Sequence, residues 1–361
     1  MIKYLGSKRR LVPVLSAVVE ASGARTGIDL FCGTTRVAQA MKRCGVHVTA
    51  VDSTRAAHAL ARAFVATDAT TIDLDALAAE VERLDALPGR AGYVAEVFCR
   101  EARYFQPANG ERIDAIRAAI AAEHAGGPWE PILLAALLDA ADRVDSTTGV
   151  QMAYLKSWAP RAERRLELRV PELLAGAGRA IRGDAVAVAP TLPPVDLAYL
   201  DPPYNQHSYA ANYHVWETIV AADEPEHYGV ACKRTDTRAP GIASAFNRKA
   251  TMPGALESVL RDVDAGAVVV SYNDESWLSL DDLRAMAGAR GRHVDVVAFD
   301  SPRYVGARIG IHNPSGEKVG RVGRLRNVEW LVVSAPDRTL VRRLVAAARA
   351  AEPIGLRPVA V

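Results

Sequence analysis

The chain has 361 residues, of which 50% are hydrophobic and 24% are charged, an ordinary composition for a globular protein with a sizeable core. The net charge of +2 is too small to identify a nucleic-acid-binding protein by itself. The four cysteines, Cys32, Cys44, Cys99 and Cys232, have no paired C-x-x-C spacing, so we expect neither a disulfide framework nor a metal site. No apolar run has the length of a signal peptide or a membrane span, and we expect a soluble cytoplasmic protein without a membrane partner.

The beginning of the chain has the pattern of a parallel α/β sheet. Residues 27–33 predict a short buried strand that runs into a glycine turn, and helical periodicity over 35–44 follows. A strand over 47–51 then ends at Asp52, and a second helix is expected over 55–65. This β-α-β-α order predicts parallel strands with helices on the faces of the sheet.

The pattern of apolar residues changes between residues 68 and 171. This segment is mostly helical in pattern and has no clear strand, so we expect an inserted helical subdomain, 68–171, within a catalytic domain formed by 1–67 and 172–361. Strand and helix patterns return afterwards. Strands are expected at 195–200, 267–272, 293–299 and 330–334, and helices at 209–221, 254–263 and 279–289.

Candidate ligand-binding residues follow the first two predicted strands. Ligands of open α/β sheets bind at the carboxyl ends of the strands, where Gly33 allows a close approach of the backbone. Asp52 is placed to accept hydrogen bonds from ribose hydroxyls, roughly twenty residues after the glycine turn, as in nucleoside-binding sites. A complete G-x-G-x-x-G motif is absent, because Thr35 occupies the position of a second glycine.

The most specific motif is Asp201-Pro202-Pro203-Tyr204, directly after a buried strand. Two consecutive prolines cannot continue a sheet and force a rigid turn. The Asp201 carboxylate and the Pro202 carbonyl can each accept one N–H of an amino group on a nucleobase, which directs the lone pair of its nitrogen towards an electrophile. Tyr204 offers a ring on which an extruded base can stack. The motif therefore predicts methylation of a base amino group.

The order of these motifs resembles that of the Dam-like adenine-specific DNA methyltransferases, the alpha group of amino-methyltransferases. The similar segments are K-Y-L-G-S-K at 3–8, D-L-F-C-G-T at 29–34, D-P-P-Y at 201–204 and S-Y-N at 271–273. Tyr-Leu-Gly-Ser-Lys and the segment 308–318 are similar to methylases of restriction–modification systems.

The resemblance implies a class I S-adenosylmethionine-dependent methyltransferase fold, a Rossmann-like seven-stranded sheet whose last strand is antiparallel. It implies methyl transfer from S-adenosylmethionine to N6 of a flipped adenine in double-stranded DNA, with the inserted subdomain recognising the target and a cognate restriction endonuclease as a partner. By the same resemblance, the catalytic residues are Asp201, Pro202, Pro203 and Tyr204. The residues implied to bind S-adenosylmethionine are Tyr4, Lys8, Asp29, Phe31, Gly33, Asp52, Asp184 and Asp201.

Two clusters of arginine are candidates for phosphate contacts, although solvated surface explains either cluster equally well. The first cluster is Arg303, Arg308, Lys318, Arg321, Arg324 and Arg326, and the second is Arg161, Arg164, Arg165 and Arg169. We expect Glu217 and Asp223 to be surface or helix-capping groups.

Two other functions remain open from the sequence. An enzyme that methylates an amino group of an RNA base also uses a loop of this kind, but small RNA methylases usually lack the helical insertion. A nucleic-acid-binding homologue without catalysis is disfavoured by the intact catalytic loop.

Overall fold

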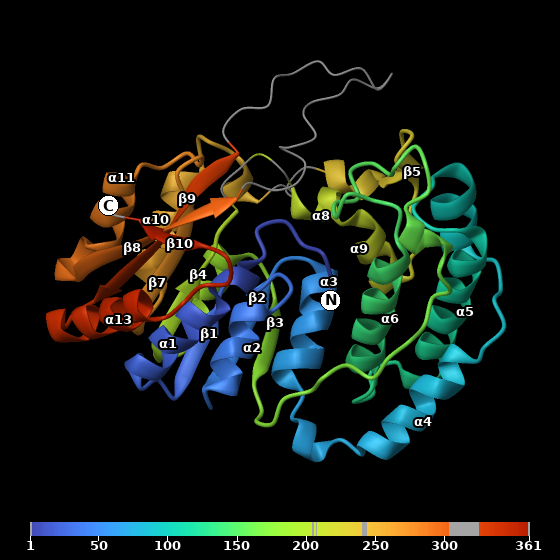
Figure 1. Cartoon of the computed structure of the whole chain (residues 1–361), viewed down its shortest axis with the longest axis horizontal. Coiled ribbons are helices and arrows are strands. Elements are labelled where there is room, and N and C mark those ends of the chain that lie inside the picture. The colour runs from blue at the N-terminus through green and yellow to red at the C-terminus, as the bar shows by residue number, and fades with distance from the viewer. Residues whose placement is uncertain (1, 204–205, 207, 240–243, 303–324, 360–361) are drawn as a thin grey trace.

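The centre of the structure, a computed structural model, is an eight-stranded sheet in the order β10-β8-β9-β7-β4-β1-β2-β3 (Figure 1). The structure describes residues 2–203, 206, 208–239, 244–302 and 325–359. Strands β3, β2, β1, β4 and β7 are parallel, whereas β9 is antiparallel to both of its neighbours, β7 and β8. The strands are β1 Thr26–Asp29, β2 His47–Asp52, β3 Arg179–Arg182, β4 Val195–Leu200, β7 Ala265–Asn273, β8 His293–Pro302, β9 Arg326–Ala335 and β10 Arg357–Val359.

The predicted α/β fold with an antiparallel last strand is confirmed, but the expected seven strands are one too few. The additional strand, β10, pairs antiparallel with the end of β8. Its three residues are all exposed, so no apolar pattern marks it in the sequence. Strand β3 was also outside the predicted elements, because its sequence, RAIR, is only partly buried at the edge of the sheet.

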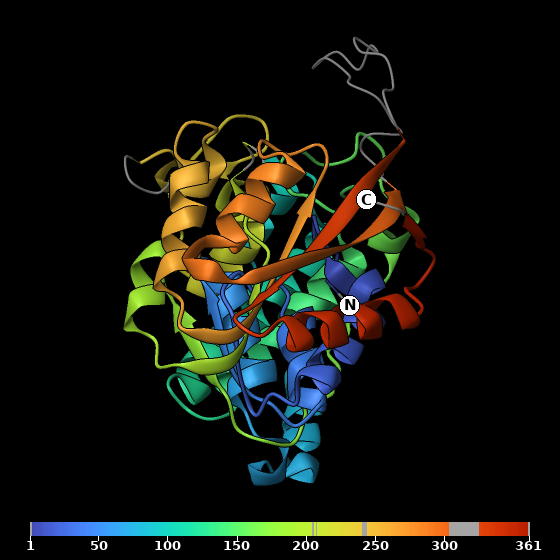
Figure 2. The ribbon, with the colours of Figure 1, turned by 90° about the vertical axis from the view of Figure 1, so that its left-hand side faces the viewer.

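Helices cover both faces of the sheet, and the strands alternate between the two resulting cores. Leu197 and Tyr199 of β4 point to the core that contains α1, α2 and α13, whereas Ala198 and Leu200 point to the core that contains α7, α10 and α11. Figure 2 shows α13 and the α10–α11 pair on opposite sides of the sheet. These helices are α1 Val12–Ser22, α2 Arg36–Arg43, α7 Ala185–Val188, α10 Met252–Asp262, α11 Leu280–Ala287 and α13 Arg338–Ala350.

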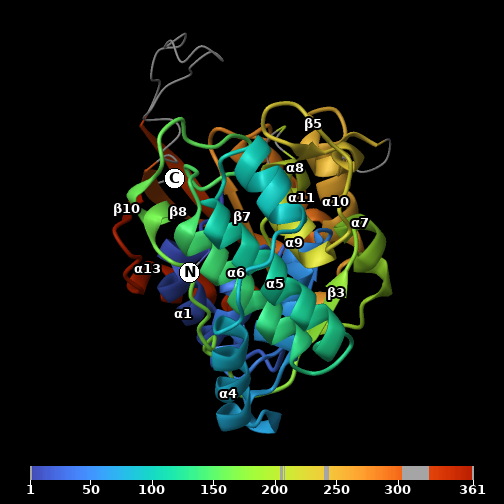
Figure 3. The ribbon, with the colours of Figure 1, turned by 90° about the vertical axis from the view of Figure 1, so that its right-hand side faces the viewer.

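A third core joins the helical segment 68–171 to the β3 side of the sheet domain. No strand occurs between residues 68 and 171, all of which the structure describes. The remaining helices are α3 Arg55–Ala61, α4 Leu74–Asp85, α5 Pro107–His124, α6 Glu130–Val144, α8 Tyr209–Asn212 and α9 His214–Ala221, with a short hairpin of β5 His227–Tyr228 and β6 Lys233–Arg234. Figure 3 shows α4, α5 and α6 on the near side of the molecule.

This third core is shared with α3 and α9, which lie outside the segment in sequence. Phe98, Phe105 and Leu137 of the segment form one buried cluster with Leu60 of α3 and Trp216 of α9. The boundaries 68–171 and the target-recognition role of the segment stay predictions. Within the described residues, none of the helices combines the length and apolarity that crossing a membrane requires.

Candidate active site

A cleft of about 940 Å³, part of it open to solvent, lies at the carboxyl ends of β1, β2 and β4. Such an edge is where open α/β sheets bind ligands. Most of the residues predicted to bind the cofactor or to act in catalysis line this cleft. They are Tyr4, Lys8, Asp29, Phe31, Gly33, Asp52, Asp184, Asp201 and Pro203. Pro202 is buried and is absent from the lining, and Tyr204 lies outside the described residues.

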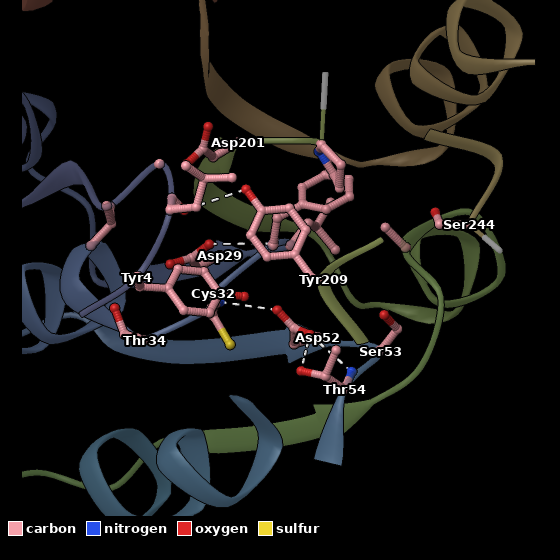
Figure 4. Close-up of a pocket in the computed structure, with 18 of the residues that line it drawn as sticks. Tyr4, Asp29, Cys32, Thr34, Asp52, Ser53, Thr54, Asp201, Tyr209 and Ser244 are labelled. Atoms are coloured by element: carbon pink, nitrogen blue, oxygen red, sulfur yellow. Dashed lines mark hydrogen bonds between the residues drawn. The ribbon is translucent and has the colours of Figure 1, made fainter. Parts of the chain in front are cut away.

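The glycine turn after β1 makes room for an aromatic ring. Gly33 has φ +46°, and a Cβ atom at this position would lie 2.9 Å from Cε1 of Tyr4. The Tyr4 ring stacks on Tyr213 with ring centroids 4.5 Å apart and on Tyr209 at 5.2 Å. In Figure 4 the rings of Tyr4 and Tyr209 lie between Asp201 and Asp52. Gly33 is therefore required both by its backbone conformation and by the packing of the N-terminal segment.

Thr35, at the position of the second glycine, also adopts the left-handed conformation, with φ +62°. A non-glycine residue in this region costs roughly 1–2 kcal/mol. The side chain offsets part of that cost, because the Thr35 hydroxyl donates to the Thr34 carbonyl at 2.7 Å and accepts from Nε2 of Gln39 at 2.8 Å. Thr35 thus holds a backbone conformation that usually favours glycine.

Asp52, at the end of β2, links the glycine turn to the start of α3. Its Oδ2 accepts the Gly33 N–H at 3.0 Å, and its Oδ1 accepts the N–H and hydroxyl of Thr54 at 2.9 and 2.8 Å. Burial raises the pKa of Asp52, and these hydrogen bonds oppose the shift. A carboxylate offers about four lone-pair positions, so these contacts leave capacity for a ligand hydroxyl.

Two further predicted acids occupy different environments. Asp29, at the end of β1, is buried, and this burial raises its pKa to about 8, so it keeps its proton at neutral pH. Asp184 follows β3 and caps α7, where its Oδ1 accepts the Val186 N–H at 2.9 Å. Gly183 N–H donates to the Asp52 carbonyl at 3.0 Å, which holds this turn against the end of β2.

Asp201, directly after β4, belongs to a buried charge network. Lys8 Nζ lies 3.0 Å from Asp201 Oδ1 and 2.7 Å from Glu329 Oε1. Burial raises the pKa of Asp201 to about 6, Lys8 acts to lower it, and the charge of Glu329 acts to raise it further. Asp201 is consequently ionised above about pH 6 and can accept hydrogen bonds there.

The sequence interpretation missed Glu329 and Tyr209. Glu329 is 8% exposed and also accepts the Ser271 hydroxyl at 2.8 Å, so the S-Y-N segment contacts it. Because β9 is antiparallel, residues near its start reach the same edge as the carboxyl ends of the parallel strands. The one feature of the sequence that could have indicated Glu329 is its position directly before the apolar run of β9.

The two arginine clusters lie only partly within the described residues. Residues 303–324, and with them most of the first cluster, lie outside that part of the chain, and Arg326 pairs with Asp300 at 2.6 Å. In the second cluster, Arg161 pairs with Asp145 at 2.7 Å. Arg165 and Arg169 pair with Asp85 and Glu167 at 2.8 and 3.6 Å. Arg165 and Arg169 remain 51% and 66% exposed in these pairs, so phosphate contacts by the second cluster stay a prediction.

Two other groups differ from the sequence interpretation. Glu217 is a capping group, but it is buried rather than at the surface, and its carboxylate accepts the N–H groups of Arg55 and Ala56 at the start of α3.

Away from the cleft, ligand atoms of Glu101, His227 and Cys232 lie within 4.8 Å of one another, a grouping that their sequence positions do not reveal. His227 Nε2 and Glu101 Oε2 are 3.0 Å apart, which a hydrogen bond between them explains.

Comparisons with known proteins show the family of the chain. A family model described as D12 class N6 adenine-specific DNA methyltransferase matches residues 4–286. Type II methyltransferase M.NlaIII from Neisseria lactamica is 28% identical over 84% of this chain and 92% of its own length. Modification methylase StsI from Streptococcus sanguinis and type II methyltransferase M.FokI from Planomicrobium okeanokoites are 26% and 27% identical, over 78% and 80% of this chain.

The chain spans 45% and 47% of the length of the last two relatives, about half of each. The matching family acts on adenine in DNA, which supports the expected enzyme over an RNA amino-methyltransferase or a silent binding protein. Because the family model covers well over half of the sequence, the chain belongs to the D12 class N6 adenine-specific DNA methyltransferases.

Proposed function

We propose that the cleft at the carboxyl edge of the sheet binds S-adenosylmethionine and an adenine flipped out of double-stranded DNA, and that Asp201 orients the adenine amino group for methylation at N6. The observation that carries this proposal is the position of Asp201. Its carboxylate lies in the cleft next to Lys8, at the start of a Pro-Pro turn. The match to the adenine-specific family supports the choice of adenine in DNA as the target.

The residues of the cleft fit the proposed cofactor. Asp52 retains lone pairs for ribose hydroxyls, and Asp184 lies beside it on the adjacent turn. Asp201 and Glu329 give this edge a negative charge that suits a cationic ligand. When bound, S-adenosylmethionine supplies an electrophilic methyl group on a sulfonium centre.

The catalytic loop acts on the target nitrogen by orientation and charge. The amino nitrogen of adenine is a poor nucleophile because its lone pair is delocalised into the ring. The Asp201 carboxylate and the Pro202 carbonyl each accept one of its N–H groups, which shifts the nitrogen towards tetrahedral geometry and localises its lone pair on the nitrogen. As the nitrogen gains positive character, its N–H becomes a stronger donor, so the contact with Asp201 strengthens most in the transition state.

We further propose that the segment 68–171 recognises the target sequence and that a restriction endonuclease of the same specificity is a partner. The endonuclease is suggested by the names of the relatives, two of which are called type II methyltransferases and one a modification methylase. DNA methylated by this protein is then expected to resist cleavage by that endonuclease.

The test is single-turnover transfer of labelled methyl groups to duplex DNA, with adenine and cytosine products resolved. Sequencing DNA from expressing cells with base-modification detection gives the sequence context. Tyr204→Ala is expected to weaken the reaction by about 1–3 kcal/mol, the contribution of a stacked base, and Tyr204→Phe to be mild. Methyl groups found only on RNA would exclude the proposed target.

A further inference from the structure

We propose that Glu329 is a positioning residue for the methylation reaction, which holds Lys8 and balances its charge, so that the negative charge of Asp201 remains available to the ligands. This inference rests on the proposed function of the cleft. Glu329 lies near the start of β9, at the carboxyl edge of the parallel strands, and it is far from Asp201 in sequence.

The contacts place Lys8 between two carboxylates. Its Nζ lies 2.7 Å from Glu329 Oε1 and 3.0 Å from Asp201 Oδ1, and the Lys8 side chain is only 7% exposed. Glu329 is fixed in turn by the Ser271 hydroxyl at 2.8 Å, two residues before Asn273, which is its partner on β7. A buried carboxylate held by a hydrogen bond and an ion pair has one orientation, so it fixes the position of the ammonium group.

The charges of the network explain why a second carboxylate is useful. A pair of Lys8 and Asp201 alone has no net charge, and the ammonium group would neutralise the carboxylate that has to face a sulfonium ion and an amino group gaining positive charge. With Glu329 ionised, the three groups together carry one negative charge. In a buried site this charge is weakly screened and attracts a cationic ligand strongly.

Other titratable groups face Asp201 from each neighbouring element. Asp29 on β1 stays protonated at neutral pH because burial raises its pKa to about 8. Tyr199 on β4 is buried, and this burial raises its pKa well above the usual value, so it stays neutral. Lys8 and Glu329 are therefore the neighbours whose charges set the ionisation of Asp201, and removing the Glu329 charge lowers the pKa of Asp201.

The test measures methylation against pH for four proteins: wild type, Glu329→Gln, Lys8→Met and the double variant. For Glu329→Gln we expect KM for S-adenosylmethionine to rise at least roughly tenfold, the effect of one buried charge over several ångströms. The acid limb of the kcat/KM profile should move to lower pH, although activity falls. In the double variant, which restores one net negative charge, the acid limb should return towards the wild-type position.

Asp262→Asn is the matched control, because Asp262 is also a carboxylate in an ion pair, with Arg261 at the end of α10, and lies outside both the cleft and the segment 68–171. It should leave the acid limb and KM unchanged. A merely structural role of Glu329 predicts lower stability without a shift of the acid limb, and that outcome, or an acid limb that the Lys8 substitution does not restore, would overturn the inference. If the wild-type protein itself does not methylate adenine, the proposed function fails instead.

Discussion

Replacement of Asp201 by asparagine should make the protein more stable while it abolishes methylation. Burial raises the pKa of Asp201 from 3.8 to about 6, so the folded protein holds a carboxylate whose ionisation is disfavoured by about two pH units. At about 1.36 kcal/mol per unit, the ionised Asp201 costs the folded state about 3 kcal/mol at pH 7.5. An asparagine side chain has nearly the same shape without that charge, so Asp201→Asn should recover most of this free energy.

The pH dependence gives the sign of the effect. Below about pH 4 Asp201 is protonated in both states, and the free energies of unfolding of the two proteins should agree. Between about pH 4 and 6 the unfolded chain releases the proton while the folded protein keeps it, so wild-type stability falls relative to Asp201→Asn. Above pH 6 the difference should be constant.

Urea unfolding from pH 4 to 8 measures this difference, and single-turnover methylation on the same samples measures the chemical step. Methylation should fall by a factor on the order of 10²–10⁴ or more, with DNA affinity nearly unchanged, because the contact acts mainly in the transition state. Equal stability of the two proteins at pH 7.5, or near-normal adenine methylation by Asp201→Asn, would refute the reasoning.

Three further substitutions test other parts of the cleft. Asp52→Ala should weaken S-adenosylmethionine binding by roughly 1.5–3 kcal/mol, the range for hydrogen bonds to charged groups, and unchanged affinity by calorimetry in a folded variant would remove Asp52 from the site. Gly33→Ala should lower the unfolding free energy by more than Gly23→Ala. Both glycines have positive φ, but a Cβ at Gly23 has nothing within 4 Å. Equal losses of stability in thermal unfolding would contradict the packing argument. Neutralising Arg321 and Arg324 should flatten the slope of log DNA affinity against log salt if the segment meets phosphates, and an unaltered slope would place these arginines on solvated surface.

The sequence was sufficient to predict four of the parallel strands, β1, β2, β4 and β7, since they are buried apolar runs that end in polar residues. It was insufficient where the edge strands carry no such run. Strand β3 reads RAIR and β10 reads RPV, and both are recognisable only from their neighbours. The expected helix over 209–221 is divided into α8 and α9 at Tyr213, because this residue departs from helical geometry with ψ 31°.

The motif residues converge on one cleft because each follows a parallel strand or belongs to the N-terminal segment packed over the sheet edge. Spacing along the chain could not place Glu329, since its contact with Lys8 depends on the antiparallel pairing of β9 with β7. Spacing also could not show that Arg161 and Arg165 form ion pairs. Their partners, Asp145 and Asp85, come close to them only in the folded helical segment. A run of basic residues in the sequence therefore does not show which of their charges are paired with acids in the fold.

The packing of the helical segment connects it to the helices that follow the Asp201 loop. Gln151 N–H donates to the Asn212 carbonyl at 2.7 Å, and its Oε1 accepts the Val215 N–H at 3.0 Å, so this residue is bonded to the helices that follow the loop. The Tyr213 hydroxyl between them accepts the Leu5 N–H at 2.6 Å, which adds the N-terminal segment to the same network. A movement of residues around Gln151 must either break these buried bonds or carry the start of α9 with it. Because breaking them leaves buried polar groups unpaired, the helices are expected to move together with the segment.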